Sequence, residues 1–143
     1  MKNAIILMGL PLAGKSDWIN NLPKKYKDYY IVSADVYKEQ HPEYDPDNAF
    51  ELHNWSVKEA EIAMNTLSDV GQVDIIMDGG GINNRYTKRI INRLKKNDYH
   101  IKLVHIKTPL EVCIERNKKR TRKVPAWAIQ EKSITENKHF HKL

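Results

Sequence analysis

Apolar and polar positions follow one another along the chain in blocks that predict strands and helices in turn. Short, nearly continuous apolar runs predict strands at residues 3–8, 29–33, 73–77 and 101–106. Apolar residues at helical spacing predict helices at 15–21, just after Asp35, at 50–70, 84–96 and 109–119, and from Pro125 onward. Strands that alternate with helices are typical of an α/β fold with a parallel sheet.

The first predicted strand, residues 3–8, is a continuous apolar run after Asn3 rather than apolar at every second position. Such a strand is expected at the centre of a sheet, with both of its faces buried. Right-handed crossovers restrict how the other strands can be added. We therefore expect a three-layer sandwich of about four parallel strands in the order 2-3-1-4, with helices on both faces.

The composition is that of a soluble globular protein. The chain has 143 residues, 41% hydrophobic and 29% charged, and we expect residues 1–143 to form a single domain. No apolar run approaches the roughly 20 residues needed to cross a bilayer. The single cysteine, Cys113, excludes an internal disulfide and is typical of a reducing compartment, so we expect a cytoplasmic protein with no membrane partner.

The charge is distributed unevenly along the chain. The formal net charge is +6, and residues 85–123 hold 14 Lys or Arg against three acidic residues. Such a basic half is typical of a surface that meets a polyanion. An ordinary solvated surface, together with the positive lining of a nucleotide site, would also produce it.

The segment from Gly9 to Ser16 matches the phosphate-loop pattern GxxxxGK[ST]. It follows an apolar strand and precedes a helix, as that motif requires. Glycines let the backbone curl so that N–H groups cradle phosphates, the lysine reaches the β- and γ-phosphates, and the serine hydroxyl binds Mg²⁺. We predict that ATP, or another nucleoside triphosphate, is bound with Mg²⁺ by Gly9, Leu12, Ala13, Gly14, Lys15, Ser16 and Asp17.

Two aspartates stand at the expected carboxyl ends of strands, where ligands gather in open α/β sheets. Asp35 follows the second strand and is the candidate catalytic base for an acceptor hydroxyl; it is also a candidate helix N-cap. Asp78 ends the third strand after an apolar run and is a candidate metal ligand beside Ser16, close to the substrate. The alternative for Asp78 is a turn-forming role before Gly79.

A basic run from Arg116 to Lys123 lies between two predicted helices. Arginine forks neutralise the charge that develops on a transferred phosphoryl group, so this run predicts a lid. Arg116 and Arg120 are the candidate catalytic arginines, and Lys15 is a further catalytic candidate. Arg120 and Arg122 are also candidates for nucleotide binding. Lys38 and Arg85 are candidates for contact with an anionic substrate, and both have an alternative as surface charges.

Together, GLPLAGKS, the SAD around Asp35, IIMDGGG…NNR and RNKKRTRKVPAWAI resemble the polynucleotide 5′-hydroxyl kinase family, within a broader group that includes zeta toxins. The resemblance implies a P-loop NTPase fold with an arginine-rich lid, Asp35 as general base, Arg120 as lid arginine, and Arg85 near the substrate. The chain departs from that family at Lys38, where arginine is common, and at Asp78-Gly79-Gly80, where Asp-Thr-Asn is common. Both departures affect acceptor recognition.

Three functions remain open from the sequence. The first is a kinase whose substrate is the 5′ end of a nucleic acid. The second is a kinase for a small-molecule acceptor, such as a nucleoside, a sugar or a sugar nucleotide. The third is an ATP-binding switch that transfers nothing. The sequence gives no indication of oligomeric state.

Overall fold

The computed structural model describes residues 1–10, 12–47, 49–78, 84–120, 124–125 and 127–130. Its sheet has four parallel strands in the order β2-β3-β1-β4, which confirms the predicted topology. The strands are β1 (Asn3–Met8), β2 (Tyr30–Ser33), β3 (Ile75–Asp78) and β4 (His100–His105).

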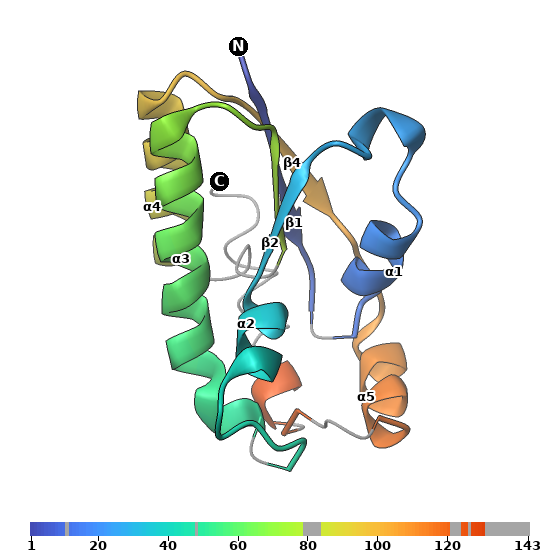
Figure 1. Ribbon diagram of the computed structural model, residues 1–143. Helices are drawn as coiled ribbons and strands as arrows, with labels where there is room; N and C mark the ends of the chain where they lie inside the picture. The colour runs from blue at the N-terminus through green and yellow to red at the C-terminus, as the bar shows by residue number, and fades with distance from the viewer. Residues whose placement is uncertain (11, 48, 79–83, 121–123, 126, 131–143) are drawn as a thin grey trace.

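Helices cover both faces of this sheet, so the molecule has three layers (Figure 1). Helices α3 and α4 lie together on one face, and α1 lies on the other. The described helices are α1 (Lys15–Asn20), η1 (Lys24–Tyr26), α2 (Ala34–Gln40), η2 (Ala49–Leu52), α3 (His53–Val70), α4 (Asn84–Lys96) and α5 (Leu110–Lys118). A further helical stretch covers residues 127–130.

The starts of α2 and α3 differ from the sequence prediction. The long helix was expected from Phe50, but Ala49–Leu52 form a 3-10 turn and α3 begins at His53. The short helix was expected after Asp35, but α2 begins at Ala34, so Asp35 lies in its first turn. The C-terminal end of α3 is as predicted, because Gly71 adopts the left-handed conformation that ends many helices.

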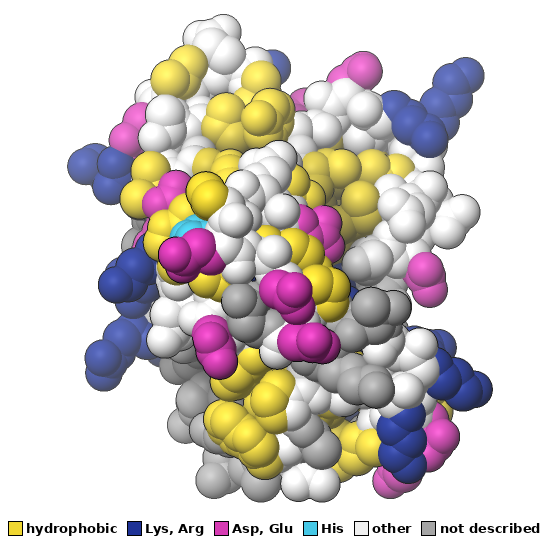
Figure 2. All heavy atoms as spheres, turned by 60° about the horizontal axis from the view of Figure 1, so that its bottom comes forward, with side chains coloured by type: hydrophobic (Ala, Val, Ile, Leu, Met, Phe, Trp, Pro, Cys, Tyr) yellow, Lys and Arg dark blue, Asp and Glu magenta, His cyan; other side chains and the backbone are white. Residues whose placement is uncertain are grey.

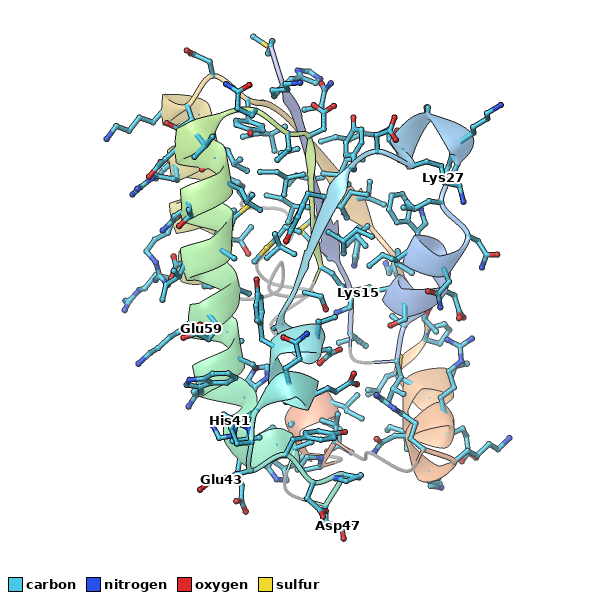
Figure 3. The ribbon with its side chains drawn as sticks, in the orientation of Figure 1. Lys15, Lys27, His41, Glu43, Asp47 and Glu59 are labelled. Atoms are coloured by element: carbon cyan, nitrogen blue, oxygen red, sulfur yellow. The ribbon has the colours of Figure 1, made fainter. Side chains whose placement is uncertain are left out.

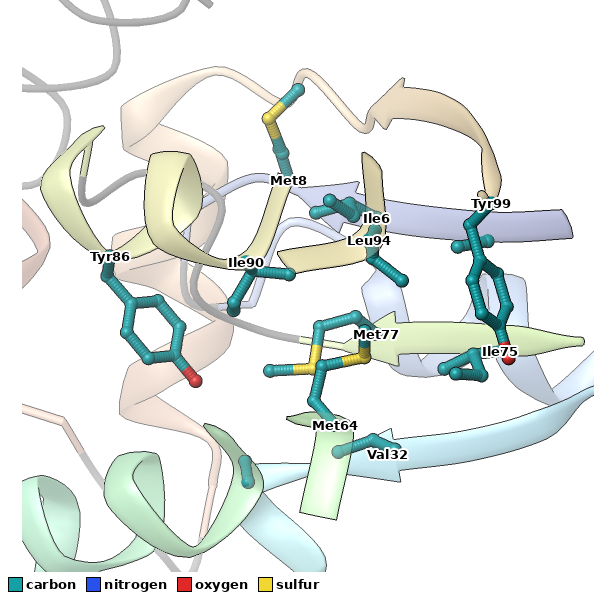
Figure 4. Packing of buried hydrophobic residues seen from close by; sticks show 12 residues of the cluster. Ile6, Met8, Val32, Met64, Ile75, Met77, Tyr86, Ile90, Leu94 and Tyr99 are labelled. Atoms are coloured by element: carbon teal, nitrogen blue, oxygen red, sulfur yellow. The ribbon is translucent and has the colours of Figure 1, made fainter. Parts of the chain in front are cut away.

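The core explains why β1 is apolar from Ala4 to Met8. Ala4, Ile6 and Met8 pack toward α3 and α4, together with buried residues of those helices such as Met64 and Ile90 (Figure 4). Ile5 and Leu7 point to the opposite face, where α1 and η1 supply the partners. Because side chains alternate along a strand, a central strand is apolar at every position that is covered on both faces, and only the half-buried Asn3 at the start of β1 is polar.

The register of the sheet brings three residues into line at its carboxyl edge. Ser33 on β2 is paired with Asp78 on β3, and Asp78 is paired with Leu7 on β1. Since β1 leads directly into the phosphate loop, the ends of β2 and β3 lie beside the start of that loop. Within the described residues, no helix is both long and apolar enough to span a membrane.

Candidate active site

The phosphate loop connects β1 to α1 by a tight turn. The N–H of Ala13 donates to the carbonyl of Leu10 at 3.1 Å, and Gly14 has a φ of 112°, a left-handed conformation that favours glycine. Leu12 also has a positive φ of 69°, which is uncommon for a side chain of its size and marks local backbone strain. Lys15 and Ser16 then open α1, and Ser16 is exposed.

Side chains from three parts of the chain hold carbonyl oxygens of this loop. The Lys15 ammonium donates to Gly9 O at 2.8 Å, Thr108 donates to Ala13 O at 2.6 Å, and Arg116 donates to Leu12 O at 2.9 Å. In a trans peptide the N–H points away from the carbonyl. Holding the Ala13 carbonyl therefore directs the Gly14 N–H to the opposite side of the loop, as phosphate binding requires.

Gly9 is required because of space rather than backbone conformation. A Cβ added at this position would lie 2.7 Å from the carbonyl oxygen of Ile106, a backbone atom just beyond β4. The Ile106 N–H donates to Met8 O at 2.8 Å, so the two chains are hydrogen-bonded at this crossing. A glycine here lets the start of the phosphate loop pack directly against the backbone at the end of β4.

Asp78 is a buried carboxylate at the end of β3, with 8% of its surface exposed. Burial raises the pKa of the Asp78 carboxyl above its usual value. The Lys15 ammonium and a hydrogen bond from the Ser33 hydroxyl, 3.3 Å from Oδ2, act in the opposite direction, whereas the Asp35 carboxylate raises the pKa further. Lys15 and Asp35 therefore both lie close enough to Asp78 to act on its charge.

Asp35 stands in the first turn of α2, with half of its side chain exposed. Ser33 occupies the N-cap position, so the N-cap alternative for Asp35 is wrong. The ammonium of Lys38 lies 3.8 Å from Asp35 Oδ1, and Lys38 is buried, with 7% of its surface exposed. Lys38 is therefore no ordinary surface charge, and it fixes a cation beside the candidate base. Figure 3 shows Lys15 at the same end of the sheet, between α2 and α1.

The basic run divides into a helical part and a part beyond the helix. Arg116 lies in α5 and contacts the phosphate loop, so it belongs to a fixed helix rather than to the connecting segment in which a lid was expected. Arg120 is half-buried just after α5, and its N–H donates to Asn117 O at 3.2 Å. Arg122 lies outside the described residues, as do Gly79 and Gly80.

Sequence reasoning missed several residues that build this site. Ser33 was used as a strand residue and as part of the SAD motif but was given no role in the site, although its hydroxyl donates to Asp78. Thr108 was not singled out. Asn117 is buried at the end of α5; its side chain bonds both the N–H and the carbonyl of Val124, at 2.8 and 2.6 Å. Asn117 stands inside the basic run, and an uncharged side chain among these cations is a signal that was available in the sequence.

Most of the predicted site residues that the structure describes lie together, and Arg85 lies apart from them. Lys15, Asp35, Asp78 and Lys38 converge at the carboxyl edge, and Arg116 meets the phosphate loop next to them. Arg85 is exposed in the first turn of α4, seven positions after Asp78, and no described contact ties it to this group. Among the described residues no cluster of three or more His, Cys, Asp or Glu could hold a metal ion by itself.

A comparison with protein families matches residues 5–137 to the AAA_33 family, described as an AAA domain. The chain belongs to this family of P-loop kinase domains. The match spans the phosphate loop, both strand-end aspartates and the basic run, so these features belong to one family domain.

One curated relative is L-seryl-tRNA(Sec) kinase of Methanococcus maripaludis, which is 30% identical over 137 residues, covering 88% of this chain and 49% of the relative. The chain thus spans about half the length of the curated relative that it matches.

Solved structures share the fold at low sequence identity. A chain of the Pnkp1/Rnl/Hen1 RNA repair complex has a TM-score of 0.78 at 18% identity, over 99% of this chain and 46% of its own length. A chain of the PezAT toxin–antitoxin system of Streptococcus pneumoniae has a TM-score of 0.67 at 24% identity, over 80% of this chain and 50% of its own. Shikimate kinase from Acinetobacter baumannii has a TM-score of 0.66 at 16% identity, over 99% and 80%. The expected fold class, a P-loop kinase fold, is confirmed.

Proposed function

We propose that this chain is an ATP-dependent kinase and that its acceptor is the 5′-hydroxyl of a polynucleotide. The observation that carries the proposal is the convergence of Lys15, Asp35 and Asp78 at the carboxyl edge of the sheet, next to the phosphate loop. A cation for the phosphates, an accessible carboxylate for the acceptor and a buried carboxylate for a metal are the parts that phosphoryl transfer needs.

The phosphate loop fits a triphosphate. Gly9 leaves room where a Cβ would collide with the Ile106 carbonyl. The bond from Thr108 to the Ala13 carbonyl would direct the Gly14 N–H of the same trans peptide away from Thr108, where it could donate to a phosphate. Lys15 would bind the β- and γ-phosphates, and Leu12, Ala13, Ser16 and Asp17 would complete the nucleotide site. Arg116, Arg120 and Arg122 would neutralise the charge that develops on the phosphoryl oxygens.

Asp78 and Ser16 would hold Mg²⁺. A buried carboxylate is costly unless a cation pairs with it, and the raised pKa of Asp78 records that cost. When bound, Mg²⁺ would neutralise negative charge on the phosphate oxygens. Ser33 would hold the Asp78 carboxylate in place through its hydrogen bond.

Asp35 would act as the general base. Its half-exposed carboxylate would accept the proton of the acceptor hydroxyl while that oxygen bonds to the γ-phosphorus and the bond to the ADP oxygen breaks. Lys38 would orient this carboxylate from its buried position. In this chemistry the proton ends on Asp35 and the displaced electron pair on ADP, so the step is balanced.

Two comparisons favour a nucleic-acid acceptor. The curated relative is named as a kinase of L-seryl-tRNA, and the structure with a TM-score of 0.78 belongs to an RNA repair complex. The net charge of +6 adds an electrostatic reason to bind a polyanion.

One observation favours the small-molecule alternative. Exposed acidic side chains follow Asp35 along the chain, and Figure 2 shows acidic groups across the middle of the face at the carboxyl end of the sheet. The exposed acidic residues of this stretch are Glu39, Glu43, Asp45, Asp47 and Glu51. These charges would repel a polyanion that lay across them, and shikimate kinase shows that the same fold serves a small acceptor.

The test is phosphoryl transfer from γ-labelled ATP to matched oligonucleotides. We expect label on 5′-hydroxyl DNA or RNA, none on the same strand already carrying a 5′-phosphate, and none with Lys15→Ala. Asp35→Asn should lower kcat by about 10²–10⁴. Label on a sugar or nucleoside panel but not on oligonucleotides would favour the small-molecule kinase. ATP hydrolysis without any labelled acceptor, unchanged in Asp35→Asn, would favour the switch.

A further inference from the structure

Helix α4 carries a basic stripe on its outer face. It has six Lys or Arg and no acidic residue among 13 positions. Tyr86, Ile90 and Leu94 face the core, so the positions on the opposite side of the helix are exposed. The stripe consists of Arg85, Lys88, Asn92, Lys95 and Lys96.

Two other arginines of α4 are already neutralised. Arg89 makes two hydrogen bonds of 3.0 Å to Glu61 of α3, and Arg93 bonds Asp69 of α3, with Nε 2.8 Å from Oδ1. These arginines fasten α4 to α3. Among the described residues, by contrast, no ion pair joins Lys88, Lys95 or Lys96 to an acidic side chain. Lys88 and Lys95 are therefore available to an external anion, whereas the Lys96 charge also acts on the Asp69 carboxylate and helps to lower its pKa.

The stripe begins near the proposed acceptor site and leads away from it. α4 starts six positions after Asp78 and runs back along the sheet. The Tyr86 hydroxyl donates to Val57 O at 3.1 Å, which fixes the first turns of α4 against α3. Ten residues from Arg85 to Lys95 rise about 15 Å, which matches roughly four phosphate spacings at ~3.4 Å per nucleotide.

We propose that the outer stripe of α4 binds the phosphates of the acceptor strand downstream of its 5′ end. This inference rests on the proposed function. The acidic residues that follow Asp35 repel the strand on one side of the site, and the stripe attracts it on the other. A strand with its 5′-hydroxyl at Asp35 would therefore leave along α4. A groove of about 350 Å³ beside the stripe, between α3 and α4, offers Asn65 and Asn92 as hydrogen-bonding groups.

The test compares short and long acceptors in two matched double variants. Lys88→Ala/Lys95→Ala removes two charges from the stripe. Lys24→Ala/Lys27→Ala removes two charges from exposed positions in and just after η1, and Figure 3 shows Lys27 on the far side of the molecule from α3. Melting curves for both variants confirm that the fold is intact. KM is measured for a dinucleotide and a 16-mer with free 5′-hydroxyls, between 50 and 200 mM salt.

For the stripe variant we expect the KM of the 16-mer to rise about tenfold, with the KM of the dinucleotide unchanged. The slope of log KM against log salt should fall by about 1.4, since each lost single-strand phosphate contact removes about 0.7. The control should behave as wild type.

The inference is overturned if the stripe variant keeps the length and salt dependence of wild type, as it would if α4 served an acidic protein. It is also overturned if the control variant loses as much, because net charge alone would then be the cause. Failure of the proposed function would give a different result, because the wild-type protein itself would phosphorylate no oligonucleotide of any length.

Discussion

Replacing Gly9 by alanine tests how closely the phosphate loop must fit against the sheet. The added Cβ would lie 2.7 Å from Ile106 O, and ordinary contact begins at 3.4 Å, so the two backbones must separate by about 0.7 Å. Neither atom belongs to a flexible side chain, and the Met8–Ile106 hydrogen bond resists the movement. Overpacking of this kind costs about 1–3 kcal/mol.

For a chain of this length that cost lowers the melting temperature by about 3–12 °C. Because Gly9 begins the phosphate loop, the same displacement moves the nucleotide relative to Asp35. A misplacement approaching 1 Å costs up to about 10²-fold in rate, so kcat/KM should fall between about tenfold and a hundredfold. Thermal melting and steady-state transfer to an acceptor measure the two effects separately.

Gly71→Ala is the matched control. Gly71 ends α3 with a φ of 70°, and the nearest atom to an added Cβ is Ser68 O, 3.7 Å away. Alanine in this left-handed conformation should lower the free energy of unfolding by about 1–2 kcal/mol, but it contacts nothing near the site. Both variants should lose stability, and only Gly9→Ala should lose activity. Wild-type kcat/KM in Gly9→Ala, or equal activity losses in both, would refute the reasoning.

Three further substitutions separate stability from chemistry. Asp78→Asn should abolish transfer yet raise the melting temperature at neutral pH. The folded pKa of Asp78 lies above its usual 3.8, so the wild-type protein loses stability as the pH rises from 3.8 through the folded pKa. Melts below pH 3.8, where the carboxyl is protonated in both states, should show no gain from the substitution. Met64→Ala, at a fully buried position, should cost about 2–5 kcal/mol in denaturant titrations with kcat nearly unchanged. Asn117→Ala leaves the Val124 N–H without its partner, which should cost about 1–3 kcal/mol by melting and lower kcat in steady-state assays.

The strand order was predictable because a parallel sheet with right-handed crossovers has few arrangements, and the apolar run from Ala4 to Met8 identifies the central strand. The start of α3 could not be predicted from the sequence, because Phe50 fits the apolar face of a helix as well as it fits the 3-10 turn that precedes His53. Periodicity alone does not distinguish the two at a helix end.

In the candidate site, too, some features could be predicted from the sequence and others could not. The phosphate-loop motif locates Lys15, and strand ends locate Asp35 and Asp78, since these are local features. The contacts that hold them are not local: Thr108 reaches Ala13 across 95 positions and Arg116 reaches Leu12 across 104. Such contacts depend on how α5 and the segment after β4 pack against the loop, and the sequence pattern around Gly9 does not predict them.

Lys38 shows how the two kinds of information combine. By sequence it is a basic residue one turn after the candidate base, placed to meet an anionic substrate. In the structure its burial and its 3.8 Å distance to Asp35 direct the charge inward. A cation committed to the base leaves less charge for the acceptor's phosphates at this position. If the acceptor is a polynucleotide, its phosphates must find their counter-charges elsewhere, and the lysines of α4 are exposed cations that the described ion pairs leave unused.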